Sequence, residues 1–241
     1  DPERVARAAG FLENAKELAF HREYRSVMGT FEGMNVLFLS TGMGGPSTAI
    51  AVEELAKIGV KAAIRIGRCG GPDAGLDTGG AMPMKELNLG DLVLVSGAVR
   101  DDGASRAYVP AQYPAIPDFG LLSACRDSAR EAVFSWHMGI ARSHDCLYGD
   151  ENPRIYEQWS RRGVMASDME TAALFVTSGL RGIRTASILN VVSRWHADVG
   201  QSVGRYADGD AAAAAGERNE ILTALMALKR IEEQERREKS L

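Results

Sequence analysis

The feature that most constrains the fold is a glycine-rich turn between an apolar run and an amphipathic run. The apolar stretch NVLFL, residues 35–39, precedes STGMGG, and the next residues predict a helix from Pro46 to Ile58, with proline in its first turn and apolar residues at helical spacing. The stretch GVKAAIRIG then predicts a buried strand that ends at Gly67. A strand, turn, helix and strand in this order are typical of α/β proteins.

The turn GMGGPS differs by one residue from the fingerprint that binds dinucleotides at a helix N-terminus. That fingerprint also requires an acidic residue at the end of the next strand, for the ribose hydroxyls. Here the next strand carries Arg65 and Arg68 instead. Because a charge inside an apolar strand is costly unless it is paired, Arg65 should face an anionic ligand or a carboxylate of the protein. The pattern favours a compact anion site over a dinucleotide site, and a simple tight turn is the alternative.

Apolar and amphipathic stretches alternate along the whole chain and predict one α/β domain, residues 1–241, with some antiparallel sheet. The glycine-rich segment 70–88 predicts an inserted flexible loop. The polar segment 101–119 predicts a second loop. The mixed-charge run 229–240 predicts a solvated helix face. We expect helices at 2–18, 46–58, 119–131, 154–162, 168–180 and 211–238, and strands within 19–41 (divided at Gly29 and at Glu32-Gly33), 59–67, 91–100, 135–143 and 182–194.

Composition excludes several classes of protein. A net charge of −4 over 241 residues gives no support to nucleic-acid binding, and no apolar run is long enough to span a membrane. The widely spaced Cys69, Cys125 and Cys146 contain no paired metal-binding motif and indicate a reducing compartment, so we expect a cytoplasmic protein. We also expect further residues before Asp1 in the natural protein.

Five stretches together resemble the uridine phosphorylases of the nucleoside phosphorylase I superfamily, in order and in spacing. They are DPERV at the start, HREY at 21–24, residues 40–67, VRDDGAS with YPAIPDF between 99 and 119, and SDMETAALF at 167–175. The resemblance implies a mixed, partly barrel-like sheet surrounded by helices. It also implies reversible phosphorolysis of uridine to uracil and ribose 1-phosphate, with inorganic phosphate as co-substrate and no organic cofactor.

The resemblance implies a homodimer whose active sites are shared. Arg4 and Arg65 should bind phosphate within one subunit, and Arg22 should reach the site of the neighbouring subunit. Arg68 stands where the family usually has a threonine and is a further candidate for phosphate. Bacterial relatives build hexamers from dimers; the insertion at 70–88 favours the dimer here, and a higher oligomer stays open.

Other roles follow from the same resemblance. Met169 and Glu170 of the DMET motif should bind the ribose. The Glu23 side chain, the Met43 carbonyl and the Ser47 hydroxyl match the family's interface site for a monovalent cation, usually K⁺, although Ser47 is equally well explained as a helix cap. The expected base-binding residues are Tyr148, Glu151, Arg154 and Arg194.

Charge determines the expected chemistry. Breaking the glycosidic bond leaves positive charge on the ribose and negative charge on the base, so Arg65, Glu170 and Arg194 are the catalytic candidates. The histidines show no triad spacing and are interpreted as structural or surface residues. Three alternatives stay open: a purine nucleoside phosphorylase, a nucleosidase that uses water, and a catalytically silent nucleoside-binding homologue.

Overall fold

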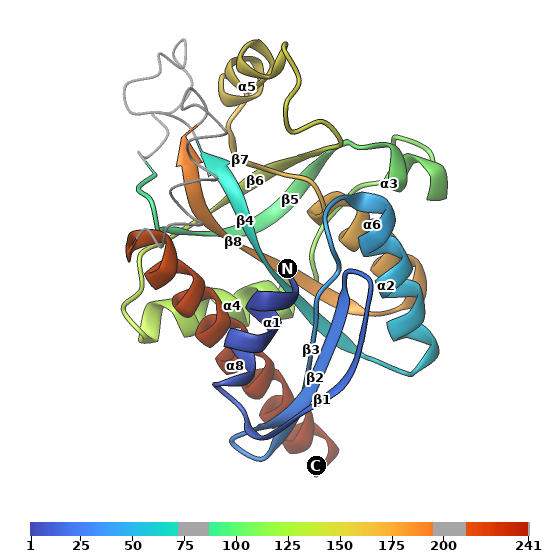
Figure 1. Ribbon diagram of the computed structural model, residues 1–241, viewed down its shortest axis with the longest axis vertical. Helices are drawn as coiled ribbons and strands as arrows, with labels where there is room; N and C mark the ends of the chain where they lie inside the picture. The colour runs from blue at the N-terminus through green and yellow to red at the C-terminus, as the bar shows by residue number, and fades with distance from the viewer. Residues whose placement is uncertain (72–86, 195–210, 241) are drawn as a thin grey trace.

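Five strands close into a barrel at the centre of the molecule, with helices around it and a separate three-stranded sheet at one side (Figure 1). The computed structural model describes residues 1–71, 87–194 and 211–240, and only the backbone of Arg194. The barrel order β4-β7-β6-β5-β8 mixes parallel and antiparallel pairs, which confirms the expected mixed, partly barrel-like sheet. Its strands are β4 (Ala62–Gly71), β5 (Leu92–Asp101), β6 (Trp136–His144), β7 (Val164–Asp168) and β8 (Arg184–Arg194).

The core lies on both faces of the barrel strands, because successive side chains of a strand point to opposite faces. In β5, Leu92 and Leu94 belong to the cluster formed with α4 and α8, whereas Val93 and Val95 belong to the cluster formed with α6. All four are fully buried, and burial of each such side chain contributes about 2 kcal/mol. This double burial explains the continuous apolar run in the sequence.

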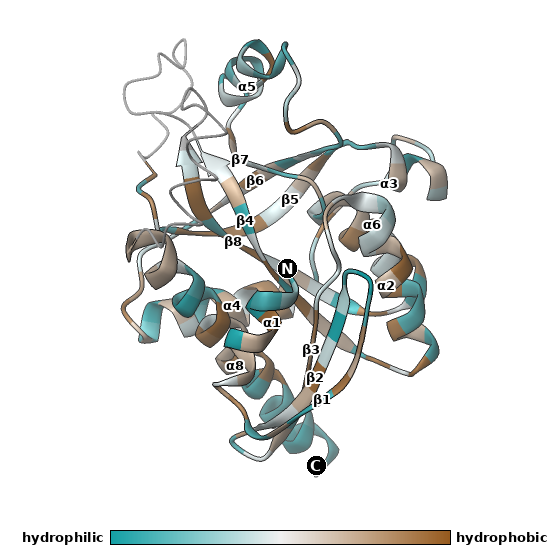
Figure 2. Cartoon of the chain, viewed as in Figure 1, coloured by the Kyte–Doolittle hydropathy of each residue, from teal (hydrophilic) through white to brown (hydrophobic). Residues whose placement is uncertain are grey.

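The expected helices after the first one are present. The last turns of α8 are exposed and hydrophilic, as expected for the mixed-charge run (Figure 2). Among the described residues, no helix combines the length and apolarity needed to cross a membrane. The helices are α1 (Pro2–Ala9), α2 (Gly45–Lys57), α3 (Gly103–Tyr108), α4 (Phe119–Glu131), α5 (Asn152–Ser160), α6 (Thr171–Arg181) and α8 (Ala211–Lys239).

The expected first helix, residues 2–18, is wrong in its second half. Helix α1 ends at Ala9, and the chain then forms the antiparallel sheet β1 (Glu13–His21), β2 (Tyr24–Phe31) and β3 (Met34–Leu39). Residues 13–18 have apolar residues at helical spacing, and this spacing was the basis of the prediction. Hydrogen bonding of β1 to β2 overrides this local preference.

The expected strand boundary at Gly29 is also wrong, since Gly29 lies inside β2. A Cβ atom there would lie 2.8 Å from the carbonyl oxygen of Glu13, so glycine permits close packing of the chain rather than a turn. The turn between β1 and β2 falls instead at Arg22-Glu23, and the boundary at Glu32-Gly33 is confirmed.

Three other boundaries differ from expectation. Strand β4 continues past Gly67 to Gly71, and most of the expected loop at 70–88 lies outside the described residues. Strand β7 was not expected, and it ends at Asp168, where the helix was predicted to begin; α6 begins at Thr171. Strand β7 has only five residues and is held by its neighbours β4 and β6, so its own sequence carries little signal.

The stretch 101–119 is not only a loop, because it contains α3, which is capped by Asp102. The buried guanidinium of Arg100 holds this stretch against β5. It donates hydrogen bonds of 2.6–2.9 Å to four backbone carbonyls, those of Ser105, Val109, Pro110 and Tyr113. The VRDDGAS stretch therefore has a structural role.

Replacing Arg100 by methionine should destabilise the fold by about 3 kcal/mol, because buried carbonyls lose charged donors. Urea unfolding followed by circular dichroism measures this change. The matched control is Arg126→Met on the surface of α4, where the arginine pairs with Asp127 and the expected change is under about 0.5 kcal/mol. Equal losses in the two variants would contradict the structural role of Arg100.

Candidate active site

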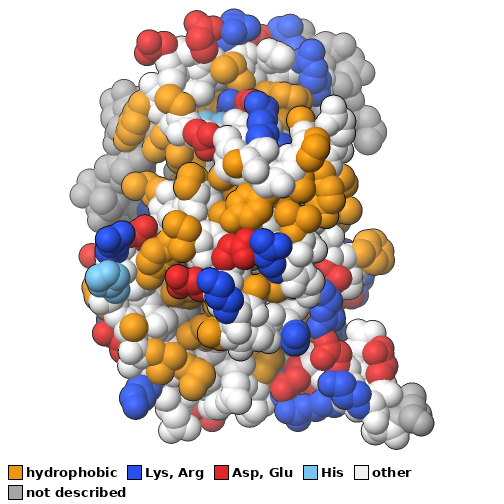
Figure 3. All heavy atoms as spheres, turned by 90° about the vertical axis from the view of Figure 1, so that its right-hand side faces the viewer, with side chains coloured by type: hydrophobic (Ala, Val, Ile, Leu, Met, Phe, Trp, Pro, Cys, Tyr) orange, Lys and Arg blue, Asp and Glu red, His pale blue; other side chains and the backbone are white. Residues whose placement is uncertain are grey.

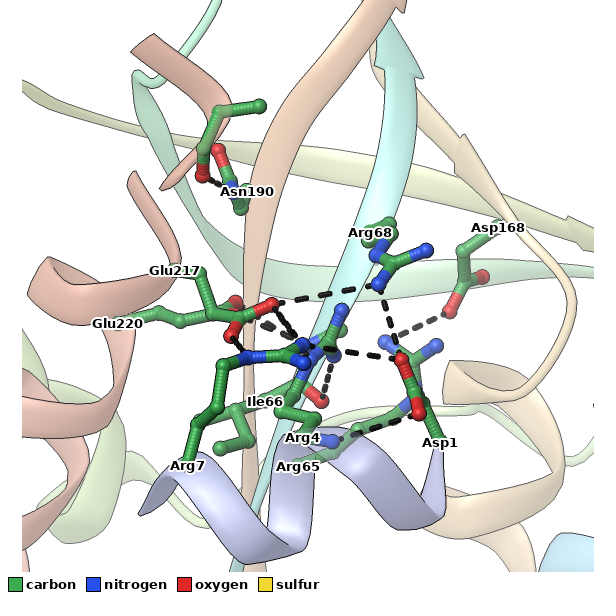
Figure 4. Close-up of polar contacts among 12 residues, drawn as sticks. Asp1, Arg4, Arg7, Arg65, Ile66, Arg68, Asp168, Asn190, Glu217 and Glu220 are labelled. Carbon is green, nitrogen blue, oxygen red and sulfur yellow. Dashed lines mark hydrogen bonds and ion pairs between the residues drawn. The ribbon is translucent and has the colours of Figure 1, made fainter. Parts of the chain in front are cut away.

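A cavity of about 990 Å³ lies beside β4. One part is polar and is lined by the start of α1, by β4, by the glycine-rich turn before α2 and by the junction of β7 and α6. The other part is apolar and runs along β3 and α8. Figure 4 shows the charged side chains that α1, β4 and α8 bring together at the polar part. The size is suitable for a small organic ligand.

Arg65 projects from β4 and has the carboxylate partners that its apolar strand requires. Its Nη1 lies 3.3 Å from Oδ2 of Asp168, and its Nη2 donates a short hydrogen bond to Oε2 of Glu170. Burial alone would lower the pKa of Arg65, but the carboxylates of Glu170 and Asp168 raise it overall. Arg65 is therefore a fixed cation at the wall of the cavity.

Gly67 makes this position of Arg65 possible. The guanidinium folds back over Gly67, and a Cβ atom on that residue would lie 2.0 Å from Nη1 of Arg65. The glycine of the RIG motif is thus required by the close approach of the arginine two residues before it.

The junction of β7 and α6 fixes the two carboxylates. Asp168 accepts hydrogen bonds from the Thr171 amide (2.9 Å), the Thr171 hydroxyl (2.5 Å) and the Ser143 hydroxyl (2.5 Å). It therefore satisfies a free amide at the start of α6. Glu170 accepts a hydrogen bond of 2.6 Å from the amide of Gly44, so the glycine-rich turn orients the carboxylate that faces Arg65.

Arg4 reaches the same cluster from α1. Asp1 caps this helix, accepting from the amides of Glu3 (2.8 Å) and Arg4 (3.3 Å). The Arg4 guanidinium donates from Nη1 to the carbonyl of Ile66 (3.1 Å) and from Nε to Glu217 (3.2 Å). Arg4 and Arg65 therefore meet at one strand from two different elements.

The family model described as the phosphorylase superfamily matches residues 1–227. The chain belongs to the phosphorylase superfamily. It is 36% identical to uridine phosphorylase of Klebsiella aerogenes over 205 residues, which is 80% of this chain and 77% of the relative. It is 33% identical to guanosine phosphorylase of Halorubrum lacusprofundi over 191 residues, 79% of this chain and 74% of the relative. A crystal structure of uridine phosphorylase from Vibrio fischeri matches with a TM-score of 0.84 and 36% identity, covering 95% of this chain and 89% of that chain.

The cavity of this phosphorylase-superfamily chain brings together part of the predicted site. Several expected residues line it, and their roles toward ligands stay predictions. These residues are Arg4, Arg65, Arg68, Tyr148, Met169 and Glu170, with Met43 at the glycine-rich turn.

The expected base-binding residues on α5 lie elsewhere. Arg154 and Glu151 are exposed and pair with each other at 2.6 Å, and neither is among the described residues that line the cavity. Arg194 ends β8 next to Ser193, which lines the cavity, but its side chain lies outside the described residues.

The residues expected at a dimer interface lie in the turn between β1 and β2 and at the start of α2. Arg22 is exposed and lies outside the described lining of the cavity. Glu23 packs against Gly42. A Cβ atom added to Gly42 would lie 2.7 Å from Cγ of Glu23 and 3.5 Å from the hydroxyl oxygen of Ser47. That hydroxyl donates to the Met43 carbonyl at 3.1 Å. Three oxygen-bearing groups thus lie near one another, as a monovalent cation would need, and the cation stays a prediction.

Sequence reasoning missed other residues of the site. His144, classed as structural or surface, is buried and lines the cavity, and burial together with Arg142 lowers the pKa of its ring. Glu217 and Glu220 were not singled out at all, yet both are buried on the inner face of α8. Their spacing from Ile221, Ala224 and Leu225 places them on the apolar stripe of that helix, which is the signal that could have found them.

A Gly67→Ala variant should fold but bind inorganic phosphate at least about tenfold more weakly, because its methyl group displaces the guanidinium of Arg65. Calorimetric titration with phosphate measures the affinity. The matched control is Gly97→Ala in β5, where a Cβ atom meets nothing closer than 3.7 Å and the affinity should stay unchanged. Unchanged phosphate affinity in the Gly67→Ala variant would show that Arg65 does not bind phosphate from this position.

Proposed function

We propose that this chain catalyses the reversible phosphorolysis of uridine, giving uracil and ribose 1-phosphate. One observation carries the proposal: the guanidinium groups of Arg4 and Arg65 and the carboxylate of Glu170 line one cavity. Guanidinium groups suit a phosphate, and a carboxylate suits vicinal hydroxyls. The uridine phosphorylases among the relatives support the choice of nucleoside.

Phosphate binds to Arg4 and Arg65, with Arg68 as a third donor at the edge. Arg65 exchanges a carboxylate of the protein for phosphate, so its charge is matched before and after binding. The exchange takes place when phosphate binds, so little reorganisation is needed at the moment of reaction. Held in this way, phosphate is placed for attack on C1′ of the ribose.

Glu170 binds the ribose hydroxyls, and Met169 packs against the sugar. The Gly44 amide holds one oxygen of Glu170, which fixes the direction of the carboxylate. In the reaction a phosphate oxygen forms the bond to C1′ while the bond from C1′ to N1 of uracil breaks. The electron pair of that bond passes to the base, where Arg194 stabilises the negative charge and Tyr148 packs beside the ring.

The guanosine phosphorylase among the relatives makes a purine nucleoside the second candidate substrate. The resemblance to the superfamily implies that a purine phosphorylase would carry an aspartate after the late strand to protonate the base. Here the late strand β8 ends in Ser193 and Arg194, without an acid. This difference favours the pyrimidine.

The test is release of uracil from uridine with and without phosphate, with guanosine, inosine and thymidine as parallel substrates. We expect cleavage of uridine that depends on phosphate. We also expect a loss of kcat/KM of at least about 100-fold in Arg65→Ala, since such charged contacts contribute roughly 3 kcal/mol. Arg161→Ala, which removes an exposed arginine paired with Glu157, is the control and should keep full activity. Preferred cleavage of guanosine or inosine, cleavage without phosphate, or no cleavage would contradict the proposal.

The active form proposed here is a homodimer with shared sites. Strand β1 is exposed along its whole length, and with β2 it presents Leu18, Phe20 and Met28 to the outside. Figure 3 shows the face that carries α2, α3 and α6, where hydrophobic side chains also gather between charged ones. Exposed apolar side chains that gather on one surface favour association of two protein chains. Arg22, placed at the tip of the hairpin, would extend into the neighbouring site.

Mixing two inactive variants tests the shared site. Arg22→Ala and Arg65→Ala should each be inactive alone, but a mixed dimer holds one site with both arginines intact. Random reassociation of equal amounts should restore about a quarter of the wild-type activity, because half of the dimers are mixed and each has one complete site. Absence of recovery, with mixed dimers demonstrated by mass spectrometry, would contradict the shared site.

A further inference from the structure

Helix α8 places two buried carboxylates behind the arginines of the proposed phosphate site (Figure 4). Glu217 pairs with Nε of Arg4 at 3.2 Å and with Nε of Arg7 at 2.6 Å. Glu220, almost one turn further along the helix, points into the same cluster. The two acids therefore differ in their surroundings. Glu217 pairs with two guanidinium groups, and the side chain of Glu220 is more completely buried than that of Glu217.

Glu220 is the less well compensated of the two. Its side chain is fully buried, and Oε2 accepts one hydrogen bond, from the amide of Gly67 at 3.2 Å. Oε1 accepts no hydrogen bond within the described part of the chain, and it lies 3.7 Å from Nη1 of Arg4. A fully buried carboxylate with one amide donor and one loose ion pair is costly to ionise.

The charged groups that face Glu220 come from three elements. Helix α1 supplies Arg4, strand β4 supplies Arg65, and its own helix supplies Glu217. Strand β8 faces the preceding turn of α8 with the neutral amide of Asn190. Burial is the main cause that raises the pKa of Glu220 to about 8; Glu217 adds to the effect, and Arg4 and Arg65 oppose it. Near neutral pH the carboxyl of Glu220 is therefore mostly neutral, and Glu217 is the carboxylate of α8 that then pairs with Arg4.

We propose that Glu220 is a positioning residue that takes up a proton when phosphate binds to Arg4 and Arg65, so that phosphate binding and the protonation of Glu220 favour each other. This inference rests on the proposed function, because it assumes an anion at these arginines. The step is a proton transfer from solvent to the carboxylate, without any change in the substrate bonds.

The physical reason is the competition for Arg4. A bound dianion adds negative charge close to Glu220 and draws the guanidinium of Arg4 toward itself, and both effects favour the neutral carboxyl. By linkage, an anion must then bind more tightly to the protonated form than to the ionised form. As the pH rises through the pKa of Glu220, phosphate affinity should fall.

The first test compares the wild type with Glu220→Gln, whose amide has the same shape, stays neutral and can still accept from Gly67. KM for phosphate and KM for uridine are measured from roughly pH 7 to pH 9.5, on both sides of the pKa of Glu220. In the wild type, KM for phosphate should rise above pH 8 by up to about tenfold per pH unit, the limit for one proton. In Glu220→Gln this rise should be absent, while KM for uridine follows the wild type.

Phosphate itself titrates identically in both experiments, so it cannot produce a difference between the two proteins. A rise in KM for phosphate that is equally steep in Glu220→Gln would overturn the proposal. Glu217→Gln is the matched control. It loosens Arg4 and Arg7 and should raise KM for phosphate, but the pH-dependent rise should remain. Because Glu217 helps to raise the pKa of Glu220, this rise should begin at a lower pH than in the wild type.

A second measurement works on the wild-type protein and without catalysis. Sulfate has the shape and charge of the phosphate dianion but does not titrate in this range. Calorimetric titration of sulfate near pH 8, in two buffers with different ionisation enthalpies, should show net proton uptake by the protein. Sulfate binding without proton uptake, or no binding of sulfate or phosphate at all, would overturn the inference. Proton uptake in a protein that fails to cleave uridine would refute the proposed reaction alone.

Discussion

The arrangement depends on one buried cation in a barrel strand. Arg65 lies in a run of apolar residues, and its charge is tolerated because Asp168 and Glu170 meet it from the junction of β7 and α6. That junction is placed by the pairing of β7 with β4 and β6, so the closed barrel positions the charged site. Removing both carboxylates would leave the buried charge of Arg65 uncompensated.

A second group of charges surrounds Arg4 beside the same strand, β4. Helix α1 brings Arg4, and α8, the last helix of the chain, brings Glu217 and Glu220, so the two ends of the sequence meet at the strand that carries Arg65. Gly67 contacts both groups of charges. The guanidinium of Arg65 folds over Gly67, and the backbone amide of Gly67 donates a hydrogen bond to Glu220. The glycine-rich turn before α2 contributes the amide of Gly44 to Glu170 and so orients this carboxylate.

The sequence predicts the parts of the fold that carry a strong local pattern. The apolar run of β5 and the periodic helices α2 and α4 are where their sequences place them. Strand β1 is exposed along its length, and strand β7 has five residues; both exist through pairing with neighbours and have no such pattern. The residues of the candidate active site also differ in how strong a signal their local sequence carries. Arg65 stands out because it interrupts an apolar strand, whereas Glu220 gives only the weaker signal of an acid on the apolar stripe of a helix, and its contact with Arg4 appears only in the folded structure.

We propose that Arg4 and Arg65 bind phosphate and that Glu170 binds the ribose. The decisive measurement is a crystal structure with phosphate and a uridine analogue whose C–C glycosidic bond cannot be cleaved. We expect phosphate oxygens within hydrogen-bond distance of both guanidinium groups and a ribose hydroxyl donating to Glu170. Phosphate bound away from these arginines, or a ribose that does not contact Glu170, would contradict it.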